Sequence, residues 1–151
     1  MPAKAITPPK CNPSPLIRTG TLSDLDAIAA IQAASPEAAQ WDPADYLQND
    51  LRVAISGLRI IGFVVTRTPG PGELEILNLA VAPDRRRQGV ARALLHASLA
   101  DFHGDVFLEV RLSNQSAQKF YKSFGFHEFI VRPEYYSSPR ETGIVMKFHS
   151  C

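Results

Sequence analysis

The sequence predicts a mixed α/β domain built around a central, largely antiparallel sheet. The length of 151 residues suits one domain with a substantial core. A composition of 45% hydrophobic and 21% charged residues is typical of a globular protein. From residue 73 onward, short apolar runs alternate with stretches whose apolar residues recur at helical spacing, which indicates the order strand, helix, strand, helix, strand.

The N-terminal part of the chain divides into a leader and the start of the domain. Residues 1–14 are rich in proline and lack periodicity, so we expect a disordered leader, with residues 15–151 forming a single domain. Leu16–Arg18 is expected to be a short strand. Thr21–Asp24 opens a helix with a hydroxyl cap and an acidic first turn. The expected buried stripe of this helix consists of Leu25, Ile28, Ala29 and Ile31.

A second short helix is expected after Asp42. This residue can cap the helix, and Pro43 suits the first helical position, so the helix should run through Tyr46 and Leu47. The segment between the two helices, residues 34–41, is predicted to be a flexible or lid-like connection.

A β-hairpin and a third strand follow. Residues 53–55 and 58–66 are rich in β-branched and apolar residues, and Ser56-Gly57 between them is a good hairpin signal. Residues 69–72, with the sequence Pro-Gly-Pro-Gly, are expected to form the turn that leads into a strand over 73–81.

The C-terminal half is expected to alternate helices and strands. A helix starts near Gly89, and its apolar face consists of Val90, Leu94, Leu95 and Leu99. A strand over 106–110 leads to a helix that Ser113 can cap and Gly125 can end. One face of that helix consists of Ala117, Phe120 and Phe124. The last two strands are predicted at 126–131 and 143–148.

Three arginines, at positions 85–87, directly precede the helix that starts near Gly89. Cations are disfavoured at the positive end of a helix dipole, by about 0.3–1 kcal/mol each, so an anion is expected to offset them. Backbone N–H groups converge there, and the small residues Gly89 and Ala91 leave room for a phosphate. A solvated basic turn is the alternative. The turn matches neither a P-loop nor the three-glycine fingerprint of dinucleotide folds.

The same turn lies within a stretch that resembles a known family. Glu75–Pro83 followed by Arg86–Leu95 is similar to the acyl-CoA-binding motif of the GNAT superfamily of acetyltransferases. Gly89 and Ala91 match the Gly-x-Gly/Ala pair of that motif. The resemblance implies a GNAT-like acyl-CoA N-acyltransferase fold with acetyl-CoA as cosubstrate.

The resemblance continues beyond this motif and covers roughly residues 15–148. Leu108–Asn114 and Phe120–Phe126 are similar to the second half of the family's site. Arg132–Tyr136 resembles the Arg-x-x-Tyr-Tyr segment of the branch that acetylates the N-terminal alanine of a ribosomal protein. Ser137 departs from that branch, whose members commonly carry proline there.

Membership of this family implies how acetyl-CoA would be held. The sheet would split where the strands ending at Val81 and Val110 diverge, and the Val81 amide would face the thioester oxygen. From sequence alone, the strand side chains at this point are equally well explained as core, and Asn114 as a helix cap. The residues that the resemblance assigns to the cofactor are Leu79, Ala80, Val81, Arg86, Arg87, Gln88, Gly89, Val90, Ala91, Arg92 and Asn114.

Glu109 is the candidate general base. It alternates with Leu108 and Val110, which places it on the opposite sheet face together with Phe107 and Arg111. Apolar neighbours favour proton uptake by a carboxylate, so Glu109 is suited to take a proton from an α-ammonium, directly or through water. A solvent-facing glutamate paired with a basic neighbour is the alternative.

Tyr121 is the candidate general acid. It follows Phe120 in the helix and is therefore turned about 100° from the apolar face. The resemblance implies that its hydroxyl protonates the departing thiolate, whereas a packing tyrosine is the alternative.

Three aromatic residues are candidates for binding the acceptor. Tyr135 and Tyr136 are expected in a loop, between Pro133 and Pro139, that frames the first residues of a peptide. Trp41 is expected either to line the peptide groove or to anchor the second helix. Loop aromatics that cover the core are the alternative for the two tyrosines.

These residues predict an N-acetyltransferase in which the amine attacks the thioester directly. The expected acceptor is a protein N-terminal α-amine, because an α-amine loses its proton more easily than a lysine side chain. The resemblance of Arg132–Tyr136 implies the N-terminal alanine of a ribosomal protein as the candidate. An acetyltransferase for small amines and a non-catalytic regulator that binds acetyl-CoA are the alternatives. The small-amine enzyme predicts a closed pocket. The non-catalytic regulator predicts that substitutions at Glu109 and Tyr121 leave function intact.

Bulk features exclude several other classes of function. A net charge of +1 gives no general argument for nucleic-acid or membrane binding. The sequence contains neither a membrane-spanning run nor a secretory signal, so a cytoplasmic location is expected. The four histidines lack metal-binding spacing, and no metal is expected. Cys11 and Cys151 are expected to be reduced thiols.

Overall fold

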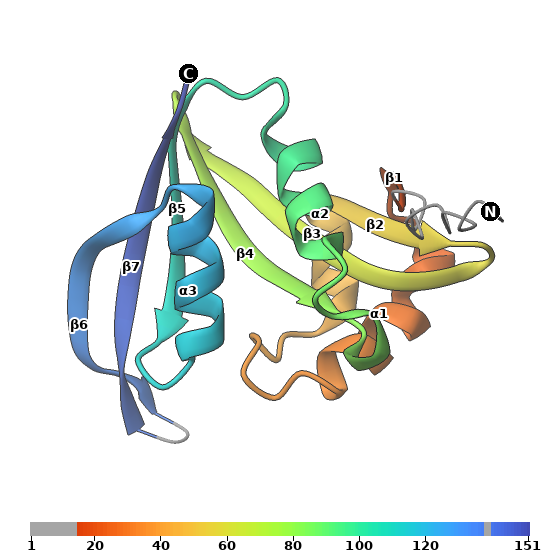
Figure 1. Ribbon diagram of the computed structural model, residues 1–151, viewed down its shortest axis with the longest axis horizontal. Helices are drawn as coiled ribbons and strands as arrows, with labels where there is room; N and C mark the ends of the chain where they lie inside the picture. The colour runs from red at the N-terminus through yellow and green to blue at the C-terminus, as the bar shows by residue number, and fades with distance from the viewer. Residues whose placement is uncertain (1–14, 138–139) are drawn as a thin grey trace, which may run out of the picture.

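The computed structural model describes residues 15–137 and 140–151, and within them a seven-stranded sheet has the order β1-β2-β3-β4-β5-β7-β6. All neighbouring strands are antiparallel except β4 and β5, which are parallel. The predicted mixed α/β fold with a largely antiparallel sheet is therefore confirmed (Figure 1). The predicted leader lies outside the described residues. The strands are β1 (Leu16–Thr19), β2 (Asp50–Ser56), β3 (Arg59–Gly70), β4 (Glu73–Val81), β5 (Gly104–Arg111), β6 (His127–Ser137) and β7 (Arg140–Ser150).

The helices divide between the two faces of the sheet. The α-helices are α1 (Leu25–Ala33), α2 (Val90–Leu99) and α3 (Gln115–Phe124). Residues of α2 and α3 pack with β4, β5 and β7 in one apolar cluster, whereas α1 packs on the other face of β2, β3 and β4 in a second cluster. Three short 3₁₀ helices are η1 (Leu22–Asp24), η2 (Pro43–Gln48) and η3 (Pro83–Arg85).

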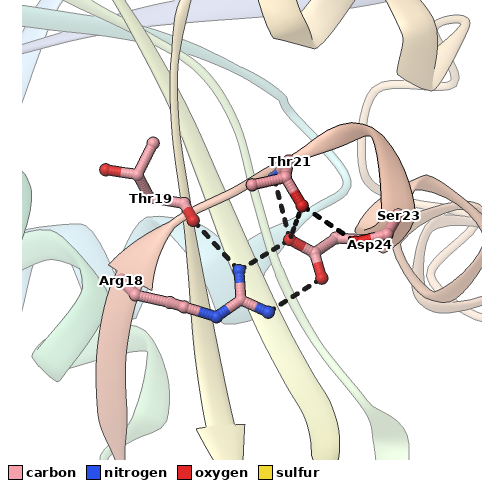
Figure 2. Close-up of polar contacts among 5 residues, drawn as sticks. All are labelled: Arg18, Thr19, Thr21, Ser23 and Asp24. Atoms are coloured by element: carbon pink, nitrogen blue, oxygen red, sulfur yellow. Dashed lines mark hydrogen bonds and ion pairs between the residues drawn. The ribbon is translucent and has the colours of Figure 1, made fainter.

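An ion pair fixes the point at which the chain passes from β1 into α1. Arg18 donates two hydrogen bonds to the Asp24 carboxylate, at 2.7 and 2.9 Å, and the Thr21 amide donates a third, at 2.8 Å (Figure 2). Asp24 is buried, and its hydrogen bond from Arg18 lowers its pKa to about 2. The start of this helix was thus predicted correctly, but its stripe was not, because Ala29 is exposed.

The predicted elements exist, although several boundaries differ. Leu58 belongs to the hairpin turn rather than to a strand, and β3 extends to Gly70, which leaves Pro71 and Gly72 as the turn. Strands β6 and β7 are longer than expected, because each pairs with its neighbour beyond the last apolar residue that marked it in the sequence. The second helix is 3₁₀, and Asp42 caps it by accepting a hydrogen bond from the Ala44 amide at 3.0 Å.

Strands β4 and β5 form a split in the sheet. They pair only over their first four residues, from Glu73 opposite Asp105 to Ile76 opposite Leu108. Beyond that point they diverge, and Figure 1 shows them close together at one end and apart at the other. The register between β3 and β4 shifts at the same place, because Val65 pairs with Asn78 and Thr66 with Ile76, which leaves Leu77 as a bulge. The split that was expected between these strands is therefore present.

Candidate active site

The edge of β4 beyond the split carries free backbone groups. Ala82 donates its N–H to Ile61 O on β3 at 2.8 Å. Because successive amides of a strand point in opposite directions, the N–H groups of Leu79 and Val81 point away from β3, toward the space that β5 has left. The Leu79 amide is already bonded to Asn78 Oδ1 at 3.0 Å, which leaves the Val81 amide as the free donor of the two. Ala80 presents its amide to β3 instead. Val81 N–H therefore lies at the open edge, where the resemblance expects the thioester oxygen.

The turn before α2 is open to a ligand. Gly89 has φ of +83° and is the N-cap of α2, and no side chain caps this helix. A Cβ built on Gly89 would meet nothing within 4 Å. Arg87 also has a positive φ, of +62°, and its exposed side chain has no partner among the described residues. Unpaired amides at the positive end of a helix, with a free cation beside them, fit the pyrophosphate of a CoA ester.

Other side chains of the motif point elsewhere. The Arg86 guanidinium contacts the chain itself, with Nη2 2.9 Å from Ser35 Oγ. Arg92 donates to Ser123 Oγ on α3 at 3.0 Å. Val90 is buried in the core. At these three positions, the side chains already have partners within the protein, so the backbone is the part that could contact a cofactor. Of the remaining motif residues, Gln88 contacts Asp84 O at 3.4 Å and Ala91 packs against the core.

Glu109 lies on β5 just beyond the last residue pair with β4. Its side chain is about one quarter exposed, with a relative accessibility of 26%, and its Oε1 lies 3.2 Å from Arg132 Nη1 on β6. The side chains of Leu108 and Val110 point into the cluster that contains α2 and α3, so Glu109 faces the opposite side of the sheet, as predicted. The sequence did not predict its partner, Arg132, because β6 and β5 are separated by β7 in the sheet.

Tyr121 lies on α3, on the side of the sheet opposite Glu109. It is buried between Phe120 and Phe126, with ring centroids 5.1 and 5.4 Å away, so the prediction that it turns away from the apolar face is wrong. Burial raises the pKa of the Tyr121 hydroxyl above its ordinary value, which keeps the proton on the oxygen. No hydrogen bond is formed by that hydroxyl within the described residues.

Asn114, rather than Ser113, caps α3. The Asn114 side chain accepts a hydrogen bond from the Ala117 amide at 3.2 Å. Ser113 instead donates its backbone N–H to Glu141 Oε1 at 2.5 Å. The sequence allowed either residue to be the cap, and the pairing of β5 with β7 brings Glu141 close enough to engage Ser113.

Tyr135 and Tyr136 lie on strand β6 rather than in a loop, which corrects the prediction. An irregularity in the pairing of β6 with β7 spans residues 132–136 and brings the two rings to a centroid distance of 5.2 Å. Tyr135 is half exposed, whereas burial and the nearby charge of Glu109 raise the pKa of Tyr136. Both tyrosines therefore frame the face on which Glu109 lies. Pro139, the far end of the predicted loop, is outside the described residues.

Trp41 lies between α1 and η2, with its side chain 46% exposed. Its carbonyl accepts a hydrogen bond from Gln32 Nε2 at 2.6 Å. No ring contact joins Trp41 to Tyr135 or Tyr136 among the described residues, so the structure does not bring the three candidates together.

A buried polar cluster beside the split was missed by the sequence reasoning. Asn78 Nδ2 lies 2.9 Å from Tyr46 Oη and 2.9 Å from Ala39 O, and Tyr46 donates to Gln32 Oε1 at 2.5 Å. Asn78 also accepts a hydrogen bond from the Leu79 amide at 3.0 Å. The sequence held one signal for this cluster, an asparagine between two leucines in an apolar strand.

Two further classes of site were examined in the described part of the chain. No group of three or more histidine, cysteine, aspartate or glutamate side chains there is placed to hold a metal ion. None of the helices described is long and apolar enough to cross a membrane.

The chain belongs to the GNAT family of acetyltransferases. A family model described as Acetyltransferase (GNAT) family matches residues 24–126, which include α1, Glu109 and Tyr121. They also include residues 85–89 before α2, here named the phosphate turn after the ligand expected for it. The resemblance inferred from the motifs is thereby confirmed at the level of the family.

Among curated proteins, the chain is similar to the ribosomal protein bS18-alanine N-acetyltransferase of Escherichia coli K12. The two are 40% identical over 80 residues, which are 49% of this chain and 54% of that protein. The match thus spans about half the length of this relative. The N-alpha-acetyltransferase RimI of Mycobacterium tuberculosis is 35% identical over 108 residues, which are 64% of this chain and 67% of that protein.

Solved structures show the same relationship over most of the chain. The ribosomal-protein-S18-alanine N-acetyltransferase of Escherichia coli is similar with a TM-score of 0.75 and 28% identity, covering 89% of this chain and 93% of that one. Ard1 from Thermoplasma volcanium is similar with a TM-score of 0.83 and 27% identity, covering 92% and 99%.

Proposed function

We propose that the protein transfers the acetyl group of acetyl-CoA to the N-terminal α-amine of a protein. The observation that carries this proposal is the split beyond Ile76 and Leu108, with Val81 N–H at its edge, Glu109 on one face of the sheet and Tyr121 on the other. A group held in the split is thereby accessible to a base from one side and to an acid from the other.

The residues that would hold acetyl-CoA are those whose backbone groups are free. The amides after Gly89 at the start of α2 suit the pyrophosphate, with Arg87 supplying a cation beside them. At the open edge of β4, Val81 N–H suits the thioester oxygen. Leu79 would contact the pantetheine arm through its carbonyl, because its amide is already bonded to Asn78 Oδ1. When bound, acetyl-CoA supplies the activated acyl group.

Glu109 and Tyr121 would act on the two protons of the transfer. Glu109 accepts the proton of the ammonium, which frees the amine to attack the thioester carbon. Val81 N–H donates to the oxygen on which negative charge develops. Tyr121, whose raised pKa keeps it protonated, gives its proton to the departing thiolate. The amine forms an amide and the carbon–sulfur bond breaks, so no covalent enzyme intermediate is needed.

The acceptor is proposed to be a peptide N-terminus. The face beside Glu109 is open, with Arg132 and Tyr135 about half exposed, and this suits an extended peptide better than a small enclosed amine. An α-amine has an ordinary pKa of about 8, against about 10.4 for lysine, so less free energy is needed to deprotonate it. The names of the similar proteins favour an alanine at the first position, as in a ribosomal protein.

A peptide screen tests the acceptor. The protein is incubated with acetyl-CoA and peptides that differ in their first residue, each with a free or a blocked N-terminus, and products are identified by mass spectrometry. We expect acetylation of free α-amines, with alanine preferred. Acetylation confined to lysine side chains would overturn the proposed acceptor.

Two single substitutions test the chemistry. Glu109→Gln and Tyr121→Phe should each lower kcat by about 10²–10⁴, because each removes one proton-transfer group. Neither should change the Kd of acetyl-CoA, measured by calorimetry. Tyr121→Phe should fold normally, since the hydroxyl makes no hydrogen bond in the described structure. Full kcat in both variants would overturn the roles proposed for Glu109 and Tyr121. Acetyl-CoA binding by the wild-type protein without transfer to any amine would instead support a non-catalytic acetyl-CoA-binding protein.

A further inference from the structure

The connection between α1 and η2, residues 34–42 and here named the acceptor loop, is held at its start by a side chain from the phosphate turn. Arg86 Nη2 lies 2.9 Å from Ser35 Oγ and 3.4 Å from Ala34 O. Arg86 Nε donates to Val81 O at 3.2 Å. One guanidinium therefore joins the end of β4, the phosphate turn and the acceptor loop.

The position of Arg86 is electrostatically favourable without any ligand. Ala34 is the C-cap of α1, where the last carbonyls of the helix lack partners and the helix dipole is negative. Ser35 is buried, with 5% of its surface exposed, whereas Arg86 is exposed, so their hydrogen bond is partly buried. The guanidinium has enough hydrogen-bond partners in the protein itself, and it does not need an anion.

Arg87, the next residue, provides a direct contrast. Its side chain is exposed and has no partner in the part of the chain that the structure describes. Two adjacent arginines of one motif are thus both exposed but differ in their partners: the Arg86 guanidinium is bonded within the protein, and Arg87 has no partner among the described residues. Of the two, Arg87 is the one whose donors are all available to a phosphate.

The far end of the acceptor loop is held from β4 as well. The bulge at Leu77 turns the Asn78 side chain toward α1, where its Nδ2 lies 2.9 Å from Ala39 O. Gln32 Nε2 donates to Trp41 O at 2.6 Å, and Asn78 lies 3.2 Å from Gln32. The loop is therefore hydrogen-bonded near its start to Arg86 and near its end to Asn78 of β4 and Gln32 of α1. The flexible or lid-like connection expected for residues 34–41 stays a prediction.

We propose that Arg86 is a positioning residue that fixes the acceptor loop relative to the point of acetyl transfer, rather than a ligand of the cofactor's pyrophosphate. The same residue whose amide faces the split, Val81, accepts a hydrogen bond from Arg86 through its carbonyl. The loop follows α1, which packs on the face of the sheet opposite α2 and α3, and Glu109 lies on that same face. A shift of the loop would therefore change the face from which the acceptor peptide is proposed to approach the thioester. The proposal rests on the proposed function, because the acceptor is taken to be a peptide.

The test compares Arg86→Met with the matched control Arg87→Met. Both substitutions remove the charge and all donors but keep the apolar stem. For Arg86→Met we expect the KM of an alanine-initiated peptide to rise about tenfold, with the Kd of acetyl-CoA unchanged, because the lost bonds are to the acceptor loop. For Arg87→Met we expect the reverse: weaker acetyl-CoA binding and an unchanged peptide KM. A rise in acetyl-CoA Kd for Arg86→Met with an unchanged peptide KM would overturn the proposal.

Hydrogen exchange gives a readout that does not need activity. In the protein without substrates, amides in residues 34–42 should exchange about tenfold faster in Arg86→Met and at the wild-type rate in Arg87→Met. Arg86→Lys, which keeps the charge and a donor, should restore part of the protection, and Ser35→Ala should show a smaller loss. Unchanged exchange in Arg86→Met would overturn the role proposed for Arg86, whether or not the protein acetylates peptides. A wild-type protein that acetylates no peptide would overturn only the proposed function.

Discussion

Single residues beside the split either face its open edge or form hydrogen bonds that hold the edge in place. Val81 does both, because its amide points into the split while its carbonyl is bound by Arg86. Glu109 faces the open side but is held by Arg132, so the carboxylate is oriented before any substrate is present. A group that is already oriented loses less entropy when the reaction begins.

Asp24 is predicted to make stability depend on pH. Its folded pKa of about 2 lies below the ordinary value of 3.8, so the stabilisation is complete above about pH 5 and is lost as the pH falls toward 2. Asp24→Asn should therefore lower the free energy of unfolding by about 2 kcal/mol at pH 7, measured by urea denaturation. The difference between variant and wild type should shrink on acidification to pH 2. A difference that persisted at pH 2 would show that the ion pair with Arg18 is not its source.

Gly89 is predicted to matter for both conformation and binding. Its φ of +83° is disfavoured for residues with a Cβ, so Gly89→Ala should cost about 1 kcal/mol of stability. The added methyl would also stand at the approach to the α2 amides, and the Kd of acetyl-CoA should rise. Gly57→Ala is the control, because Gly57 also has a positive φ and open space around its Cβ but lies in the β2–β3 hairpin. Equal acetyl-CoA affinity in the two variants would contradict this role for Gly89.

At the scale of elements, the two helices that pack on the same face of the sheet, α2 and α3, begin differently. Helix α3 is capped by Asn114, whereas no side chain caps α2. The amides of α2 therefore remain available, while those of α3 are already partly satisfied. The start of α2 is accordingly the better anion site of the two.

The cap of α3 can be measured separately from any contact with the cofactor. Asn114→Ala should lower the free energy of unfolding by about 1 kcal/mol, measured by thermal or urea denaturation. Ser116→Ala, an exposed change within the same first turn, should alter stability by less than about 0.5 kcal/mol. If Asn114→Ala left stability unchanged but weakened acetyl-CoA binding, the residue would be a cofactor contact rather than a cap.

For the whole molecule, the two faces of the sheet differ in character beside the split. Helices α2 and α3 cover one face of the sheet and bury Tyr121. On the other face lies Glu109 of β5, together with the charged and aromatic residues of β6. Figure 1 shows α3 lying against the limb formed by β5, β7 and β6. In the mechanism that we propose, Glu109 and Tyr121 would therefore act from opposite sides of the sheet.

Local patterns predicted most of the elements and the motif residues. The Ser56-Gly57 hairpin, the cap at Asp42 and the helix after Gly89 follow from signals within a few residues of each other. Errors arose where a distant segment decided the outcome. Ser113 lost the role of cap because Glu141 engages it, and Tyr121 is buried because Phe126 and the strands close over it.

The sequence by itself determined the fold class, the family and the turn that suits a phosphate, because each depends on periodicity or on a contiguous motif. Only the tertiary structure decided which of two adjacent arginines is free, since Arg86 is occupied by Ser35, which lies 51 residues earlier in the chain. The structure likewise revealed the partner of Glu109 and the role of Asn78 beside the split. These contacts depend on strand order and on a β-bulge, and neither is encoded in the residues that flank the contacting side chains.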